Sequence, residues 1–153
     1  MNANDYFLPK AADSADLSRW ASVLPTEAQV LRTSLFGDVF LVDGRGAVHM
    51  LERGCCSVAE IAPSEERFWR ALEADEEGWQ LRGLADACRA EGKVLVSTQC
   101  YAFTIPPLFS GGDYIPENVW VAPWQEWFSL TADIFQQTKN LPDGTNIRFE
   151  VSD

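Results

Sequence analysis

The side chains that could perform chemistry are few, and they are not spaced for catalysis. The chain of 153 residues has one histidine, His49, in the apolar run Ala47–Leu51. Nucleophilic catalysis needs a nucleophile, a base and a group that orients the base. A histidine between Val48 and Met50 is more typical of a strand residue that alternates with buried neighbours. We therefore expect His49 to be structural and the protein not to be an enzyme.

Metal and phosphate motifs are also missing from the sequence. Zinc sites use four nitrogen, sulfur or oxygen ligands at short spacings, and the chain has neither a CxxC nor an HxxxH pair. The glycines in Phe109–Tyr114 lack the Lys and Ser/Thr of a phosphate-binding loop. The acidic run Glu73–Gly78 lacks the ligand spacing of a calcium loop and is more typical of a solvated helix junction. We expect no cofactor and no metal ion.

Carboxylates alone could still form a hydrolytic pair. The chain has 23 Asp and Glu residues, and any two of them could meet after folding. Their spacing nominates no particular pair. A hydrolase that uses only carboxylates stays open as an alternative, and its sign would be buried carboxylates with raised pKa values that converge in a cleft.

The four cysteines favour free thiols in a reducing compartment. The N-terminal residues show neither the basic start nor the apolar core of a signal peptide, and no run approaches the length of a membrane span. Cys55 and Cys56 are adjacent and would point to opposite faces of a strand, which disfavours a shared disulfide or metal ion. We expect a cytoplasmic protein whose cysteines, including Cys88 and Cys100, stay reduced.

The charge balance is strongly acidic. Twelve Lys and Arg against 23 Asp and Glu give a formal net charge of −11, which opposes binding to nucleic acid and to anionic membranes. No cation occurs between Lys93 and Lys139, whereas acidic residues continue through that stretch. This half of the sequence is expected to carry a negative potential, although solubility alone would also explain an acidic surface.

The hydrophobic pattern predicts one α+β domain over residues 1–153. The chain is long enough for one core and too short for two ordinary domains. The runs on either side of Asp43-Gly44 predict an antiparallel hairpin, and residues 1–15 are expected to be a flexible lead-in. We predict a mainly antiparallel meander packed with about four helices. The strands are expected within 28–34, 37–43, 47–53, 55–62, 93–105, 117–122 and 145–152, and the helices within 14–24, from 64 onward, 77–91 and 124–140.

The segment Tyr101–Val121 combines aromatic residues with paired prolines and paired glycines, and it has no Lys or Arg. Tyr114 lies in a turn of this segment, and turns are exposed and often carry recognition. The aromatic residues of the following helix, Trp124, Trp127 and Phe128, are better explained as core. The predicted partner-contact residues are Asp113, Tyr114, Glu117 and Trp120. The competing surface is the acidic junction of Glu73, Asp75, Glu76 and Glu77.

The order of several segments resembles a known family. The segments are LFGDVFLVDGRGAVHMLE, IAPSEERFWRAL, QCYAFTIPPLFSGGDYIPENVWV and QQTKNLPDGT. Over about residues 28–149 the chain is similar to the type VI secretion immunity family of the Tdi type, which is grouped with GAD-like proteins. The positions that match the family's motif are Gly37, Phe40, Asp43, Gly46, Tyr101, Pro107, Gly111, Gly112, Asn118, Leu141, Pro142, Asp143 and Gly144.

The resemblance implies an α+β bacterial protein without enzymatic activity. Such a protein binds and silences a cognate toxin, a DNase in the best understood members, in the cytoplasm of the cell that makes it. The matching glycines, prolines and aromatic residues are typical of structural positions, so the resemblance assigns no toxin-binding residue.

Two main hypotheses follow from the sequence. In the first, the protein is an immunity protein, monomeric or homodimeric, that blocks a nuclease-type toxin by occlusion or by conformational locking. In the second, it is a small-molecule or peptide-binding module with a pocket formed by the aromatic segment. A deep pocket beside Tyr101, Tyr114 and Trp120 would favour the second hypothesis, and a flat acidic face there would count against it.

Overall fold

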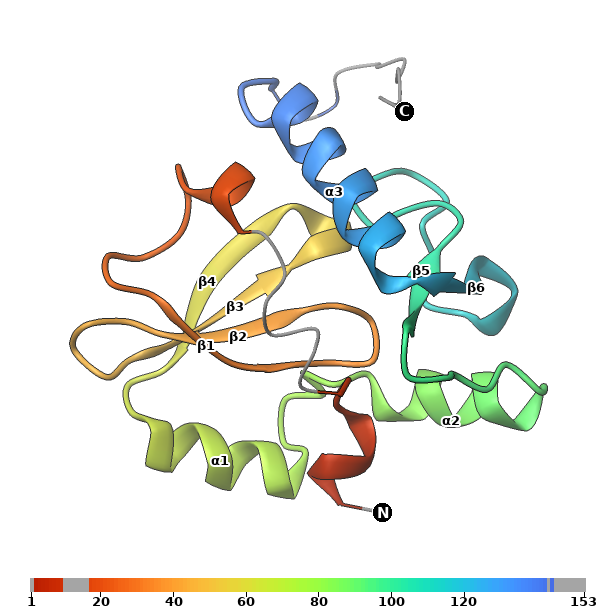
Figure 1. The fold of residues 1–153 in the computed structure, drawn as a ribbon, viewed down its shortest axis with the longest axis horizontal. Coiled ribbons are helices and arrows are strands. Elements are labelled where there is room, and N and C mark those ends of the chain that lie inside the picture. The colour runs from red at the N-terminus through yellow and green to blue at the C-terminus, as the bar shows by residue number, and fades with distance from the viewer. Residues whose placement is uncertain (1, 10–16, 143, 145–153) are drawn as a thin grey trace.

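The structure is a computed structural model that describes residues 2–9, 17–142 and 144. It confirms the α+β class. The centre is an antiparallel meander of four strands in the order β1-β2-β3-β4, and a two-stranded hairpin, β5–β6, lies beside it (Figure 1). The strand bounds are β1 Gln29–Thr33, β2 Val39–Val42, β3 Val48–Glu52, β4 Ser57–Ala62, β5 Gln99–Phe103 and β6 Val119–Pro123.

Within the described ranges the structure has three α-helices, α1 Glu65–Ala74, α2 Arg82–Ala90 and α3 Trp124–Thr138, so the prediction of about four was slightly too high. Of the helix expected within 14–24, the described part forms only the 3-10 turn η3, Ser18–Trp20. No side chain caps its start at Leu17. Instead, Trp20 is fully buried and stacks on Phe135 with the ring centroids 4.4 Å apart. Tertiary packing has overridden a weak local preference here.

The two faces of the meander pack against different helices (Figure 1). One face, with Phe40, Val48 and Met50, packs on Phe68 and Leu72 of α1. The opposite face packs on α3 and η3 and contributes Val39, Leu41 and Leu51. This alternation is the period-two pattern of a strand with both faces covered. A third cluster joins β5, β6 and α2 to the N-terminal residues and the first turns of α3.

The hairpin predicted at Asp43-Gly44 is confirmed. Strands β2 and β3 pair in register from Val39 with Leu51 to Val42 with Val48. The Asp43 carboxylate accepts hydrogen bonds from the backbone N–H groups of Arg45 at 2.8 Å and Ala47 at 3.1 Å, which closes the turn. Acidic side chains favour turns for this reason.

The helix predicted over 77–91 begins later than expected. The Ser64 hydroxyl caps α1 by accepting from Arg67 N at 3.3 Å, as the sequence predicts. Residues 75–81 then form a connection instead of a helical turn, with positive φ at Asp75, Gly78 and Leu81. Buried Gln80 anchors this connection by donating to the Ala3 carbonyl at 2.9 Å.

Residues 2–9, which belong to the expected flexible lead-in, are packed into the fold. Ala3, Tyr6 and Leu8 are buried. Leu8 N donates to Thr33 O at 2.8 Å, and Leu35 N donates to Tyr6 O at 3.1 Å. The segment therefore continues the edge of the meander, which its small and polar composition does not reveal.

The strand expected within 93–105 is shortened to β5, because residues 93–98 belong to the connection between α2 and β5. The Lys93 ammonium donates to the carbonyls of Pro116 and Val119, and the Tyr101 hydroxyl donates to Lys93 O. The last predicted strand, 145–152, lies outside the described residues. Of the helices that the structure describes, none is long and apolar enough to span a membrane.

Candidate functional site

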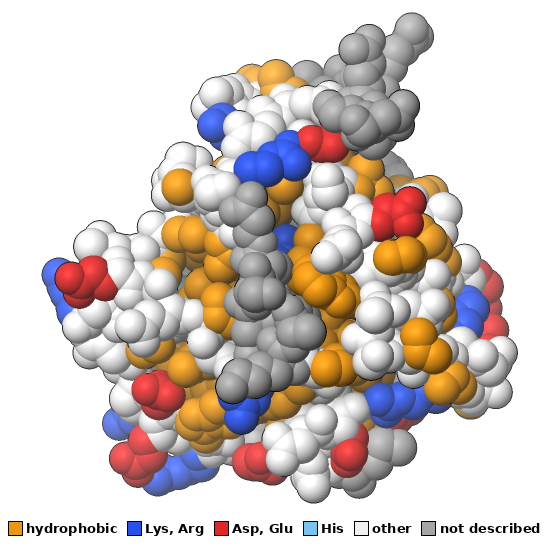
Figure 2. Space-filling view, in the orientation of Figure 1, with side chains coloured by type: hydrophobic (Ala, Val, Ile, Leu, Met, Phe, Trp, Pro, Cys, Tyr) orange, Lys and Arg blue, Asp and Glu red, His pale blue; other side chains and the backbone are white. Residues whose placement is uncertain are grey.

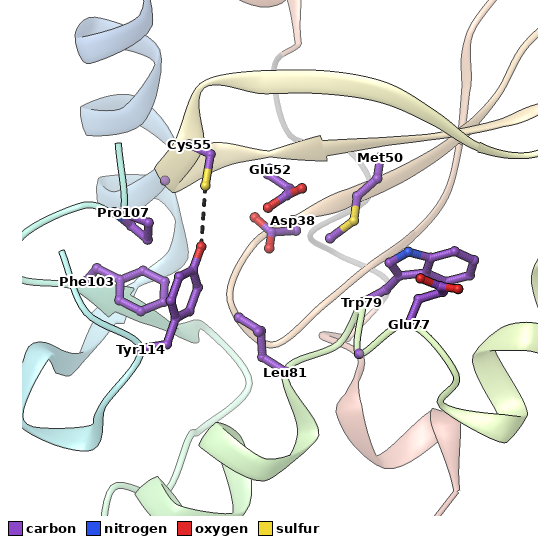
Figure 3. Close-up of a pocket in the computed structure, with 12 residues that line it drawn as sticks. Asp38, Met50, Glu52, Cys55, Glu77, Trp79, Leu81, Phe103, Pro107 and Tyr114 are labelled. Carbon is purple, nitrogen blue, oxygen red and sulfur yellow. Dashed lines mark hydrogen bonds between the residues drawn. The ribbon is translucent and has the colours of Figure 1, made fainter. Parts of the chain in front are cut away.

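Four segments that are far apart in sequence enclose a cavity of about 210 Å³. They are the turn before β2, the end of β3 with its 3-10 turn η4 (Arg53–Cys55), the α1–α2 connection, and β5 with the following loop. Figure 3 shows Tyr114 and Phe103 on one side, Trp79 and Glu77 on the other, and two carboxylates between them. The lining residues are Asp38, Met50, Glu52, Gly54, Cys55, Glu77, Gly78, Trp79, Leu81, Phe103, Pro107 and Tyr114.

The Asn118 side chain joins the two ends of the loop from Thr104 to Asn118. Asn118 is buried; its amide oxygen accepts from Ile105 N at 2.9 Å, and its amide nitrogen donates to Ile105 O at 2.9 Å and to Asp113 O at 3.0 Å. These bonds tie the beginning of the loop to its end. Tyr114 therefore lies in a loop whose two ends are fixed to each other by hydrogen bonds.

Close backbone packing fixes the same loop against η4 and against itself. Leu108 N donates to Gly54 O at 2.9 Å, and a Cβ atom on Gly54 would come within 2.7 Å of the Pro107 ring. At Gly112 a Cβ atom would lie 2.2 Å from the Pro106 carbonyl oxygen. Only glycine permits such approaches, so both positions are structural.

Asp38 places a buried carboxylate in the wall of the cavity. Its side chain follows the turn at Gly37, which has a φ of +82°, and the residue is only 8% exposed. Its Oδ1 accepts from Arg53 N at 2.9 Å. Burial raises the pKa of this carboxyl from 3.8 to about 7, with Glu52 adding to the rise and the Arg53 N–H opposing it.

The Arg53 side chain is buried beside Asp38 without pairing with it. Its Nε donates to Gly37 O at 2.6 Å, and its guanidinium carbon lies 3.7 Å from the centre of the Phe128 ring. The two terminal nitrogens have no hydrogen-bond partner among the residues that the structure describes. Burial lowers the pKa of Arg53 to about 10, so it is still a cation at neutral pH.

Tyr114 is half-exposed, but its hydroxyl reaches into the cavity. It shares a hydrogen bond of 3.4 Å with the Cys55 thiol (Figure 3). The ring meets Phe103 edge-on, with the centroids 5.5 Å apart. Burial raises the pKa values of both the Tyr114 hydroxyl and the Cys55 thiol, so both are protonated at neutral pH.

The four predicted partner-contact residues, Asp113, Tyr114, Glu117 and Trp120, are all exposed. Of these, only Tyr114 lines the cavity. The competing acidic junction meets the same cavity through Glu77 alone. Tyr114 of the predicted contact loop and Glu77 of the acidic junction therefore lie on opposite sides of the same cavity.

A scan against protein-family models, a search of curated proteins and a search of solved structures each returned no match.

Several of the positions that the sequence analysis compared with the family's motif have structural roles. Phe40 and Tyr101 are fully buried, and Gly46 and Gly111 have positive φ. Asn118 braces the loop as described above. Asp143 lies outside the described residues. The sequence-based interpretation of these positions as structural agrees with these contacts.

His49 has a partner that the sequence did not reveal. Its Nε2 lies 2.8 Å from Asp43 Oδ2. With exposed Glu60, opposite His49 on β4, these residues have ligand atoms within 4.8 Å of one another and could hold a divalent cation. The other oxygen of Asp43 already accepts the hydrogen bonds that close the hairpin turn. The contact between His49 and Asp43 is therefore explained as a further stabilisation of that turn.

The remaining charged side chains are dispersed on the face that Figure 2 shows, where acidic and basic groups alternate around the edge. The cavity is a stronger candidate site than such a mixed surface. Sequence reasoning missed Asp38 and Glu52, its central residues. Their only signal was that each is an acidic residue at the end of an apolar strand pattern.

Proposed function

We propose that the protein is an immunity protein. It binds and neutralises a cognate toxin of a type VI secretion system, a DNase-type effector, in the cytoplasm of the producing cell. It acts by occlusion or by conformational locking and performs no chemistry of its own. The proposal is supported by the resemblance of residues 28–149 and by the net charge of −11.

The single observation that carries the proposal is the acidic cavity between Tyr114 and Glu77. Asp38 and Glu52 face its interior (Figure 3), and none of the residues that line it is Lys or Arg. A nuclease needs a basic cleft to hold the phosphates of DNA. An acidic, aromatic-walled site complements such a cleft, because opposite potentials favour encounter and a buried aromatic contact adds affinity.

Co-expression with the cognate toxin, to be sought in the neighbouring genes, tests the proposal. We expect cells that express both to survive and cells that express the toxin alone to lose their DNA and die. The free protein is expected to leave DNA uncut. Equal killing with and without this protein would reject the proposal.

The predicted contact loop can be tested separately by charge reversal. We expect Asp113→Lys with Glu117→Lys to slow association with the toxin about tenfold, because steering by charge changes association rates by this order or more. The matched control is Glu60→Lys with Glu65→Lys, which makes the same change in charge on β4 and α1. Stopped-flow association rates measure the effect, and equal rates for the two double variants would move the interface away from this loop.

The residues that line the cavity also favour the alternative function, a small-molecule-binding module. Its walls include apolar Met50, Leu81 and Phe103 together with a few polar groups, as ligand sites do. Its volume of about 210 Å³ is below the range of about 300–1,000 Å³ that is usual for such sites. Tyr101 is buried and Trp120 does not line this cavity, so of the three aromatic residues named for the pocket only Tyr114 takes part in it.

The carboxylate hydrolase has part of its predicted sign, because one carboxyl, Asp38, is buried with a raised pKa and lines the cavity together with Glu52. Assays with chromogenic glycosides and esters decide between these functions. Turnover that is lost in Asp38→Asn would establish an enzyme in place of a binding protein.

A further inference from the structure

The carboxylates of the cavity form no ion pair with a described residue, although the buried Arg53 guanidinium attracts Asp38 without contacting its carboxylate. In the part of the chain that the structure describes, the five ion pairs include none from Asp38, Glu52 or Glu77. Asp38 is 8% exposed, and its Oδ2 makes no hydrogen bond with a described residue. The nearby Arg53 guanidinium packs on Phe128 instead. The Oδ2 atom of Asp38 is reached by solvent through the cavity, so it can accept a hydrogen bond from a ligand that enters there.

A second carboxylate, that of Glu52, makes the binding of a cation in the cavity more favourable. Figure 3 shows the side chains of Asp38 and Glu52 turned toward each other between Tyr114 and Met50. Like charges in a partly buried site repel, and a cation between them converts the repulsion into two attractions. Glu77 adds a third negative charge at the edge, beside Trp79.

The aromatic walls select a flat cation. Tyr114 and Trp79 stand on opposite sides of the two carboxylates (Figure 3). Trp79 is fixed by stacking on Phe68 at 5.6 Å, and Tyr114 by its contact with Phe103. A guanidinium stacks on aromatic rings and binds carboxylates with a planar fork of N–H groups, which an ammonium cannot do.

The size of the cavity fits one long side chain. A water molecule takes up about 30 Å³, so a cavity of about 210 Å³ has room for about seven non-hydrogen atoms. An arginine side chain has that number beyond its Cα atom.

We propose that this cavity is a socket for one arginine side chain of the toxin. Its guanidinium binds Asp38 and Glu52 and lies against Tyr114, and its stem passes between the apolar walls. The inference rests on the proposed function, because the toxin supplies the arginine. Nuclease clefts use arginine to hold phosphate, so a captured arginine is one that the toxin needs for DNA.

Blocked tripeptides test the socket without any toxin. The probes are acetyl-Gly-Arg-Gly-amide, its lysine analogue and its citrulline analogue, which has the shape of arginine without the charge. We expect the arginine peptide alone to shift the NMR signals of the Trp79 indole and the Met50 methyl strongly. Equal shifts with citrulline, no shifts at all, or tighter binding of lysine would overturn the proposal.

Charge-neutral variants locate the binding. We expect Glu52→Gln and Asp38→Asn each to weaken the arginine peptide about tenfold, the usual effect of losing a hydrogen bond to a charged group. The control is Glu126→Gln, the same change on an exposed residue that does not line the cavity. Unchanged affinity in both cavity variants, measured by NMR titration with the fold checked by circular dichroism, would also reject the socket.

The toxin then separates this inference from the proposed function. If the wild-type protein protects cells and the Asp38→Asn, Glu52→Gln double variant binds the toxin equally tightly, the socket is wrong and the immunity function stands. If the peptide experiments succeed but the wild-type protein gives no protection, the socket stands and the immunity function is wrong.

Discussion

Asp38 shows how one residue can be costly for the fold and useful for binding. It lies between the positive-φ turn of Gly37 and the first residue of β2, where both neighbours are buried. Its backbone position is set by the turn, so its carboxylate cannot leave the interior without moving β2. The hydrogen bond from Arg53 N offsets only part of the desolvation.

We expect Asp38→Asn to stabilise the protein at neutral and alkaline pH. Because the pKa of Asp38 is raised from 3.8 to about 7 on folding, the folded state keeps a proton that the unfolded chain releases. The free energy of unfolding therefore falls as pH rises from 3.8 to about 7 and is level above that. Asparagine keeps the acceptor for Arg53 N and has no charge, so the gain at pH 8 is at most about 4 kcal/mol.

Urea unfolding from pH 4 to pH 8 measures this effect as the difference between variant and wild type. The difference is expected to grow with pH up to about 7. A pH-independent difference would show that Asp38 does not carry the raised pKa. Since the same variant is expected to bind the arginine peptide more weakly, increased stability would exclude misfolding as the cause of weaker binding.

At the scale of elements, the loop between β5 and β6 has little regular secondary structure apart from the 3-10 turn Pro116–Asn118, and hydrogen bonds hold it in place. Asn118 reaches both ends of it, and Lys93 donates to the carbonyls of Pro116 and Val119 from outside. The paired prolines and glycines that mark this segment in the sequence are needed for tight backbone approaches. The sequence predicted a shaped turn here, but it did not show which side chain holds the turn.

We expect Asn118→Ala to destabilise the protein by about 1–3 kcal/mol, because it leaves the Ile105 N–H without its acceptor. Amide exchange in residues 104–118 is expected to accelerate more than exchange in the meander. Gln125→Ala, on an exposed position of α3, serves as the control and is expected to change stability by less than about 0.5 kcal/mol. Uniform acceleration over the whole chain would mean that Asn118 supports the entire fold and not this loop.

At the scale of the whole molecule, the net charge of −11 acts over longer distances than any single contact. Acidic and basic groups are interspersed on the face in Figure 2, so the excess of acid sets a general negative potential. The cavity is the local site at which the toxin is expected to bind. Long-range steering and local fit are thus separable properties of the protein.

Changes in ionic strength should separate long-range electrostatic steering from the local fit of the toxin in the cavity. We expect the association rate with the toxin to fall at least about tenfold between 0.01 M and 0.15 M salt, as the screening length shrinks from about 30 Å to about 8 Å. The dissociation rate is expected to change much less, because buried contacts are weakly screened. Surface plasmon resonance at several salt concentrations gives both rates, and a salt-independent association rate would show that charge does not steer the encounter.

The sequence by itself determined the features that depend on neighbouring residues. The meander, the hairpin at Asp43, the cap at Ser64 and the amphipathic α3 follow from periodicity and turn chemistry, which act over a few residues. Only the tertiary structure decided where the cavity lies and which acidic residues line it. Asp38, Glu52, Glu77 and Tyr114 come from separate segments, and the burial of a carboxylate depends on what the rest of the chain places around it. A local pattern contains no information about such distant neighbours.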